Sequence, residues 1–179
     1  MNEAYYFWTA EQVAGYIKKH QEYIFALVVR IEDDLARLVI ANGFKHPQLL
    51  EAHNLFLVGS RKMEVHLKKE LITILPFAKR YAKALKKGKR GKPGLQSACP
   101  GIHKMYEEHK HRILPFHLIA HKLRNVKISE KDKPLYDNIC RNLTRLRQRW
   151  QEQLHLENDV LFPKIIEMEA LLYPIDYKP

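Results

Sequence analysis

The chain has 179 residues, of which 46% are hydrophobic and 28% are charged, a balance typical of a folded globular protein and not of a disordered one. Two cysteines, Cys99 and Cys140, are too few for a disulfide framework, and their number favours a reducing compartment. The formal net charge of +11 is compatible with an acidic partner or nucleic acid, and equally with solubility alone.

The first predicted helix begins after a capping box, in which Thr9 is the N-cap and Gln12 bonds back to it. Asn42 and Gly43 end the helix, because both residues tolerate the left-handed conformation common at helix C-termini. Apolar residues recur between these signals at helical spacing: Val13, Tyr16, Ile17, Ile24, Leu27, Ile31, Leu35 and Leu38.

The second predicted helix runs from Pro47 to about Leu85, because proline suits the first turn of a helix and the apolar period continues across this stretch. Pro76 lies inside it and is expected to introduce a kink. A basic segment rich in glycine and proline follows at 86–100. It is the only clear linker in the sequence, and we expect it to be an exposed loop.

The third predicted helix spans about Gly101 to Leu123, with a bend at Pro115. The fourth begins after Asp132, a suitable N-cap, and runs to about Pro163. The four segments predict an all-α, up-down-up-down four-helix bundle. We expect one domain over 1–179, with its core at about 9–172.

Polar residues interrupt the apolar face of each predicted helix. Because an α-helix turns by about 100° per residue, each residue can be placed against the apolar stripe of its own helix. His66 and Glu70 are one turn apart and share a face. The side chains at the centres of the four buried faces are His20, His66, Glu70, His109 and Glu157, and Gln153 lies one turn before the last of these.

This inward-facing set predicts a metal site with nitrogen and oxygen ligands. A single buried histidine is more often a hydrogen-bonded core residue, and a single buried glutamate can pair with arginine. Buried carboxylates cost several kcal/mol unless they are paired or coordinate a metal. Two glutamates and three histidines from all four helices match the kind of cluster that binds two iron or two manganese ions.

Two motifs resemble a known family. The segment Leu154-His-Leu-Glu-Asn-Asp-Val-Leu-Phe-Pro163 resembles the fourth-helix signature of hemerythrin-like proteins, and His66-Leu-Lys-Lys-Glu70 supplies a His-x-x-x-Glu motif. The chain is most similar to the di-iron domain of the iron-cluster-repair proteins, from about Val13 to Pro163. The resemblance implies a hemerythrin-like four-helix bundle whose irons are held by histidines from all four helices and bridged by two glutamates.

Carried over by motif, the resemblance implies five iron ligands in this sequence. The first-helix histidine matches His20, and the second-helix pair matches His66 and Glu70. The third-helix histidine matches His109, and the bridging glutamate of the fourth helix matches Glu157.

Two positions depart from the family pattern. Gln153 replaces the histidine four residues before the last glutamate, and Asn42 replaces the histidine that precedes the second helix, where His46 is a nearby substitute. Amide oxygens are weaker iron ligands than imidazole. We therefore expect one stronger site, built from His20, His66 and one or both glutamates, and a second that is weaker or empty. The stronger set suits Fe(II), with Mn and Zn as competitors.

The resemblance implies a role in iron handling, iron–sulfur cluster repair or the response to nitric oxide or oxygen. Damaged iron–sulfur proteins are then the expected partners, and the sequence leaves open whether the protein catalyses a reaction or only carries or senses. The alternative is a metal-depleted bundle whose basic surface binds an acidic partner or nucleic acid. Nucleic acid is not favoured, because no nucleic-acid-binding motif is visible. The sequence has neither the features of a secretory signal nor a run of about 18 apolar residues. We expect a cytoplasmic protein with no membrane role.

Overall fold

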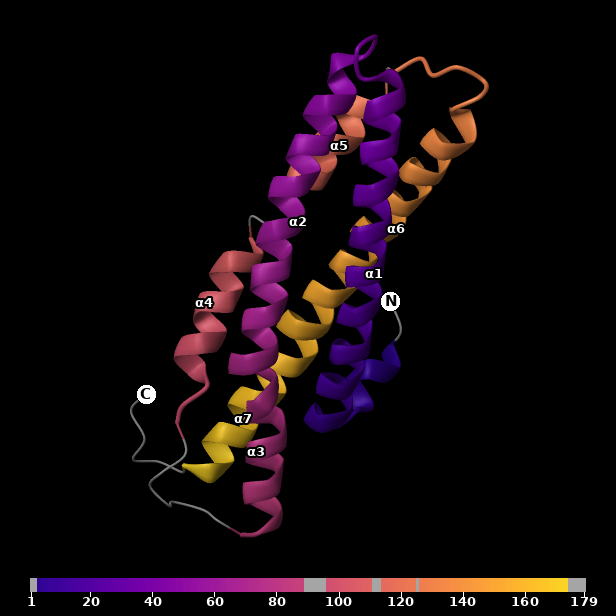
Figure 1. Cartoon of the computed structure of the whole chain (residues 1–179). Coiled ribbons are helices and arrows are strands. Elements are labelled where there is room, and N and C mark those ends of the chain that lie inside the picture. Colours follow the sequence, from indigo (N-terminus) through magenta and orange to yellow (C-terminus); the bar gives the residue numbers. More distant parts are fainter. Residues whose placement is uncertain (1–2, 89–95, 111–113, 125, 174–179) are drawn as a thin grey trace. The chain divides into compact units, whose positions relative to one another are not determined.

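The computed structural model describes residues 3–88, 96–110, 114–124 and 126–173, and within them it contains helices and no strand (Figure 1). None of these helices combines the length and the apolar composition that a membrane span needs. In chain order the elements are η1 (Glu3–Phe7), α1 (Ala10–Asn42), α2 (Pro47–Thr73), α3 (Leu75–Lys86), α4 (Cys99–His109), α5 (Leu114–Leu123), α6 (Lys133–His155), η2 (Leu156–Leu161) and α7 (Phe162–Leu172).

The start of α1 confirms the predicted capping box. The side-chain oxygen of Gln12 accepts a hydrogen bond from the backbone N–H of Thr9 at 2.8 Å, and the Thr9 hydroxyl accepts one from the Gln12 N–H at 3.2 Å. The helix then continues without interruption to Asn42, as the apolar period predicts. Its register places Ile17, Ile24 and Ile31 fully inside the protein.

The second predicted helix is two helices. The first, α2, ends at Thr73 and the second, α3, begins at Leu75, so the chain breaks at Ile74 and does not merely kink. Pro76 stands in the first turn of α3, where its missing N–H costs nothing. At the other end of α3, Gly88 takes a left-handed backbone with φ +63°, which a glycine adopts without strain. Most of the predicted basic loop, 89–95, lies outside the described residues.

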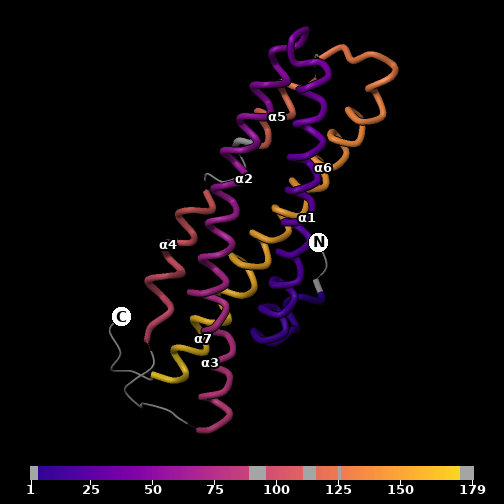
Figure 2. The backbone as a smooth tube through the Cα atoms, viewed as in Figure 1, coloured from indigo at the N-terminus to yellow at the C-terminus, as the bar shows by residue number. Residues whose placement is uncertain are grey.

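The third predicted helix is also two helices, because α4 ends at His109 and α5 begins at Leu114. The fourth predicted helix continues past Pro163, and its winding changes from α to π and back to α along the way. Three helical segments, α6, η2 and α7, follow one another with no residue between them, and Figure 2 shows their continuous path. The all-helical class is therefore confirmed, while the up-down four-helix arrangement stays a prediction.

The chain divides into two compact units. The first unit comprises Met1–Gln21, Leu67–Lys110 and Glu152–Pro179, and the second comprises Glu22–His66 and His111–Gln151. The helices α1, α2 and α6 each pass from one unit into the other.

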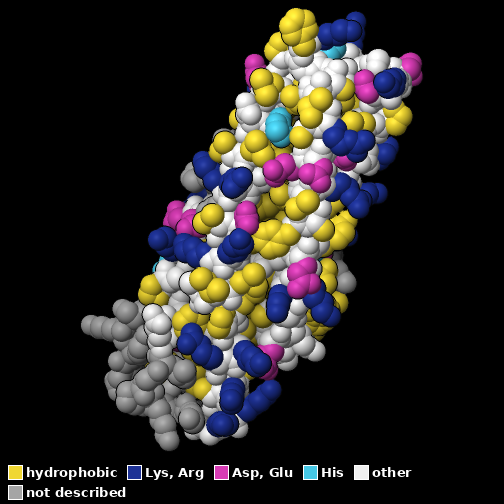
Figure 3. All heavy atoms as spheres, viewed as in Figure 1, with side chains coloured by type: hydrophobic (Ala, Val, Ile, Leu, Met, Phe, Trp, Pro, Cys, Tyr) yellow, Lys and Arg dark blue, Asp and Glu magenta, His cyan; other side chains and the backbone are white. Residues whose placement is uncertain are grey.

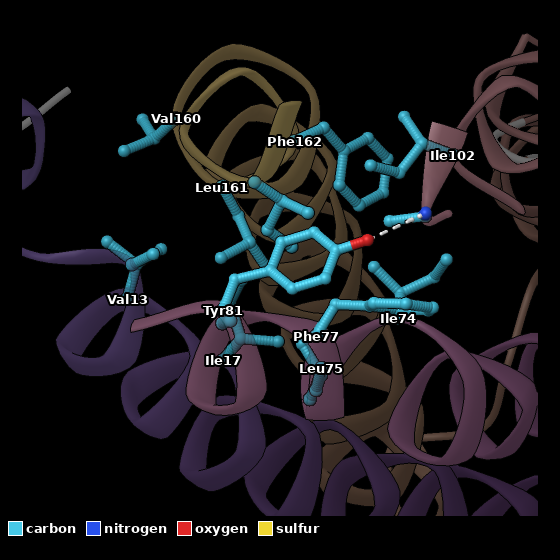
Figure 4. Close-up of a cluster of buried hydrophobic side chains, with 14 of the residues drawn as sticks. Val13, Ile17, Ile74, Leu75, Phe77, Tyr81, Ile102, Val160, Leu161 and Phe162 are labelled. Carbon is cyan, nitrogen blue, oxygen red and sulfur yellow. Dashed lines mark hydrogen bonds between the residues drawn. The ribbon is translucent and has the colours of Figure 1, made fainter. Parts of the chain in front are cut away.

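The first unit has a hydrophobic core centred on Tyr81 of α3. Figure 4 shows this ring surrounded by apolar side chains that include Ile17, Ile102 and Phe162. The backbone N–H of Ala98 donates a hydrogen bond to the Tyr81 hydroxyl at 3.1 Å. The core therefore fixes the chain just before α4, the helix that carries His109.

The second unit is held together by apolar packing and by a polar pair between α1 and α6. The rings of Phe56 on α2 and Phe116 on α5 meet edge to face, with centroids 6.3 Å apart. Asn138 of α6 donates to the carboxylate of Asp34 on α1 at 2.8 Å. The ring pair ties α2 to α5, and the polar pair ties α1 to α6 within the unit.

Candidate metal centre

Two buried glutamates of the first unit lie side by side. Glu70 is in the last turn of α2 and Glu157 is in η2, and both side chains are fully shielded from solvent. Their carboxyl groups interact directly. Desolvation raises the pKa of Glu70 to about 7, and desolvation together with the neighbouring Glu70 charge raises the pKa of Glu157 well above its ordinary value.

Glu157 is presented by a π-helical turn. The N–H of Phe162 donates to the carbonyl of Glu157, five residues earlier, and not to the carbonyl four residues earlier as in an α-helix. The next residue, Pro163, has no N–H to offer to the carbonyl of Asp159, so the α-helical bond pattern cannot continue through this point. Single π-helical turns inside α-helices are rare and occur frequently at functional sites.

His109, the last residue of α4, lies beside Glu157. Its Nδ1 lies 2.6 Å from the side-chain oxygen of Asn158, which can only accept, so Nδ1 carries the proton and donates. Its Nε2 then faces the carboxylate oxygen Oε2 of Glu157 at 3.3 Å. The ring of Phe162 stacks on the imidazole, with centroids 5.9 Å apart and planes at 18°. The histidine is thus held in one tautomer and one orientation.

His20 on α1 meets the glutamates through an amide. Its Nδ1 donates to the side-chain oxygen of Gln153 at 2.9 Å, and the Gln153 side-chain nitrogen donates onward to Glu157. A second amide, from Gln21, donates to Glu70 at 2.9 Å. Gln153 therefore links His20 to the carboxyl pair by hydrogen bonds.

His66 lies on α2 one turn before Glu70, as the spacing predicts, and is fully buried. Its ring and the Trp150 ring meet edge to face, with centroids 5.8 Å apart. Ligand atoms of His66, His109 and Glu157 all lie within 4.8 Å of one another. This buried His/His/Glu group can hold a metal ion, although its second histidine is His109 and not the His20 of the predicted stronger site.

The centre has more acceptors than donors. Among the described residues, no hydrogen-bond partner is found for four of its buried atoms: Glu70 Oε1, Glu157 Oε2, His20 Nε2 and Gln21 Oε1. With Nδ1 as its donor, His109 faces the Glu157 carboxylate with a lone pair, an arrangement that requires a proton or a cation between them. Several convergent lone pairs without donors are what a metal ion satisfies.

Asn42 and His46 are not brought to this group. The side chain of Asn42 donates to Asp132 at 3.1 Å, and Asn42 stands 22 residues after His20 on the same helix, about 33 Å along its axis at 1.5 Å per residue. His46 immediately precedes α2 and stands 20 residues before His66, which is about 30 Å along the helix axis at 1.5 Å per residue. Long stretches of α1 and α2 separate these side chains from His20 and His66.

Three side chains that orient these groups are not indicated by any sequence motif. Asn158 fixes His109, Gln21 bonds to Glu70, and Glu152 faces His20 Nε2 at 3.5 Å. The only signal for them is adjacency, because Gln21 follows His20 and Asn158 follows Glu157 in the chain. Side chains that hydrogen-bond to a metal-binding histidine fix its tautomer and ring orientation.

Comparisons with known proteins do not assign the chain to a family. No protein-family model matches it, and neither a curated protein nor a solved structure does. The resemblance to hemerythrin-like proteins thus rests on the sequence motifs alone.

Proposed function

We propose that this chain is a hemerythrin-like, non-heme iron-binding protein that acts in iron handling, in iron–sulfur cluster repair or in the response to nitric oxide or oxygen. The observation that carries the proposal is the shortage of donors around Glu157, where a second buried carboxyl group and an oriented imidazole nitrogen converge. A bound cation would compensate the charge that burial otherwise makes costly.

The donor set favours iron among the metals it could take. Imidazole and carboxylate ligands suit Fe(II), with Mn and Zn as competitors, and no thiolate is part of the group. His66, His109 and Glu157 would hold the ion, and Glu70 adds a carboxylate beside them. Iron supplies the ability to bind oxygen or nitric oxide and to exchange electrons. The protein's own residues contribute orientation, through Asn158, and exclusion of water, through complete burial.

Metal analysis of the purified chain tests the proposal. After growth in iron-supplemented medium we expect fewer than two irons per chain, because Gln153 occupies a position at which the family has a ligand. His66→Ala and Glu70→Ala should each remove most of the bound metal, since each takes one buried ligand from the group. His155→Ala is the matched control, because that histidine bonds to the exposed Asp159 at 2.6 Å. A protein that binds no iron, or that loses it only in the control, would overturn the proposal.

Gln153→His tests the expected cause of the low stoichiometry. Imidazole would replace the amide between His20 and Glu157, so iron per chain should rise toward two. The larger ring enters a tightly packed core, and a stability loss of about 1–3 kcal/mol is expected with it. Two tightly held irons in the unmodified protein would show that the amide already serves as a ligand.

A second candidate, a metal-free bundle that binds an acidic partner or nucleic acid, has one observation in its favour. Gln21 and Gln153 already donate to the two glutamates, and one proton shared between the carboxyl groups would further satisfy them without a metal. On the face shown in Figure 3, however, Lys and Arg side chains are interspersed with acidic and apolar ones. Co-purified nucleic acid, read from the 260 to 280 nm absorbance ratio, together with absence of metal would favour this candidate.

A further inference from the structure

A groove in the second unit lies between α5 and α6, apart from the residues of the metal centre. Its volume is about 380 Å³, at the small end of the ~300–1,000 Å³ typical of ligand pockets. One wall comes from α5 and the other from α6, in each case from residues at helical spacing. The lining consists of Phe116, Ala120, Leu123, Arg124, Tyr136, Cys140, Leu143, Thr144 and Arg147.

The floor of the groove is apolar and firmly supported. Phe116 and Leu143 are buried, and the Phe116 ring packs edge to face on Phe56. At one end the Tyr136 hydroxyl donates to the Leu123 carbonyl at 2.7 Å, which joins the two walls. A hydrocarbon chain placed here would be removed from water at about 25 cal/mol for each Å² of buried apolar surface.

The charge of the groove is positive only. The lining contains Arg124 and Arg147 and no acidic residue. Arg147 is half-buried, and its Nε is shielded from solvent without a hydrogen-bond partner among the described residues. The nearby carboxylates of α6 and its preceding turn are already bonded, Asp137 to Lys133 at 3.3 Å and Asp132 to Asn42 at 3.1 Å. The lining therefore offers no carboxylate to the buried Nε of Arg147.

We propose that this groove binds a small carboxylate with an unbranched apolar chain, whose chain lies on Phe116 and Leu143 and whose carboxylate bonds to Arg147. Such a molecule matches both features of the groove: its chain covers the apolar floor, and its carboxylate accepts a hydrogen bond from the unsatisfied buried N–H of the arginine. Along α6, Tyr136 and Arg147 are 11 residues apart, about 16 Å of helix, which leaves room for an extended chain.

The two cysteines make the test direct, because Cys140 lines the groove and Cys99 belongs to the first unit. Alkylation of each thiol by iodoacetamide is followed by mass spectrometry in the metal-free, full-length protein, with added decanoate. We expect decanoate to slow the labelling of Cys140 about tenfold at ten times its dissociation constant and to leave Cys99 unchanged. Burial raises the pKa of the Cys140 thiol, so the labelling is run at a fixed alkaline pH.

Comparison ligands separate the two halves of the proposal without any substitution. Decanol keeps the chain and lacks the charge, inorganic phosphate keeps a negative charge and lacks the chain, and hexanoate shortens the chain. All three should protect Cys140 less than decanoate does. Equal protection by decanol or by phosphate, or no protection by decanoate, overturns the proposal.

A matched pair of arginine variants locates the head group. Arg147→Gln should weaken decanoate about tenfold, or 1.4 kcal/mol, while Arg145→Gln removes the same charge from an exposed position of α6 outside the lining and should change little. Equal weakening in both variants would mean that general positive charge attracts the ligand and would overturn the assignment to Arg147.

Discussion

At the scale of single residues, the candidate metal centre depends on how the charge of two buried carboxyl groups is compensated. Glu70 and Glu157 are fully buried and adjacent, so both cannot carry a negative charge without a compensating proton or cation. The side chains around them supply two amide donors and several lone pairs. Either a proton or a metal ion can supply the missing positive charge, and only a metal ion fits the proposed function. The stability of the protein depends on pH differently in the proton-bound and metal-bound forms.

Metal-free protein should lose stability as the pH rises from about 4.5 to 7. Burial raises the pKa of Glu70 from 4.5 to about 7, so in this interval the folded chain holds a proton that the unfolded chain has released. Stability falls with pH wherever the folded state binds more protons, and the contribution is constant above pH 7. Urea unfolding in the presence of a chelator, at pH 5, 6, 7 and 8, measures the free energy of unfolding.

The informative quantity is the free energy of unfolding of the unmodified protein minus that of Glu70→Gln, because this subtraction isolates the one side chain. This signed quantity should fall as the pH rises, because the unmodified protein loses stability while glutamine keeps the side chain's shape and has no proton to lose. Glu167→Gln, at an exposed position of α7, is the control and should give a constant difference. A value that stays constant from pH 5 to 8 would mean that Glu70 is ionised in the metal-free fold.

At the scale of elements, prolines and one buried glutamate decide where the helices break and how they are joined. Pro76 and Pro163 each stand in the first turn of a helix that follows an interruption, a break in the first case and a π-helical turn in the second. Glu169 on α7 accepts hydrogen bonds from the Tyr81 hydroxyl at 2.9 Å and from the Ala98 N–H at 2.8 Å. This contact ties α3 and α7 to the residue that precedes α4.

Glu169→Ala should lower the free energy of unfolding by about 1–3 kcal/mol, because two buried donors lose their shared acceptor. Part of the loss is recovered, since the Tyr81 hydroxyl can still donate to the Gln96 carbonyl, at 2.8 Å. Glu167→Ala, one of the exposed positions of the same helix, should change stability by less than about 0.5 kcal/mol. Chemical denaturation followed by circular dichroism measures both, and equal effects would contradict the role assigned to Glu169.

At the scale of the whole molecule, the two units share three helices. Because α1, α2 and α6 run through both, a unit cannot unfold without breaking the hydrogen-bond ladder of each shared helix. The chain has two tryptophans, and they fall one in each unit, Trp8 in the first and Trp150 in the second. They are therefore local reporters of the two units.

We expect the two units to unfold in one cooperative transition. In the single-tryptophan variants Trp8→Phe and Trp150→Phe, the fluorescence transition in denaturant should coincide with the circular dichroism transition of the same variant, which is the test for two-state behaviour. Comparison within each variant removes the effect of the substitution on overall stability. A fluorescence transition that precedes loss of helix in one variant would show that its unit opens separately.

Much of this organisation was predictable from the sequence because it depends on local periodicity. The capping box at Thr9, the length of α1 and the inward direction of His66, Glu70, His109 and Glu157 all follow from residue spacing on a helix. A helical period reports which face of its own helix is buried, and it does so without knowledge of the neighbours.

The tertiary structure decided which of these inward-facing residues meet. Gln153 bonds to His20, Asn158 fixes His109, and Asn42 lies a long helix away from the carboxyl pair. Such pairings depend on where helices break and on the axial position at which they pack, and periodicity carries no information about position along a neighbouring helix. The sequence by itself thus determined the kind of side chain available to a metal, and packing determined the group His66, His109 and Glu157 that can share one.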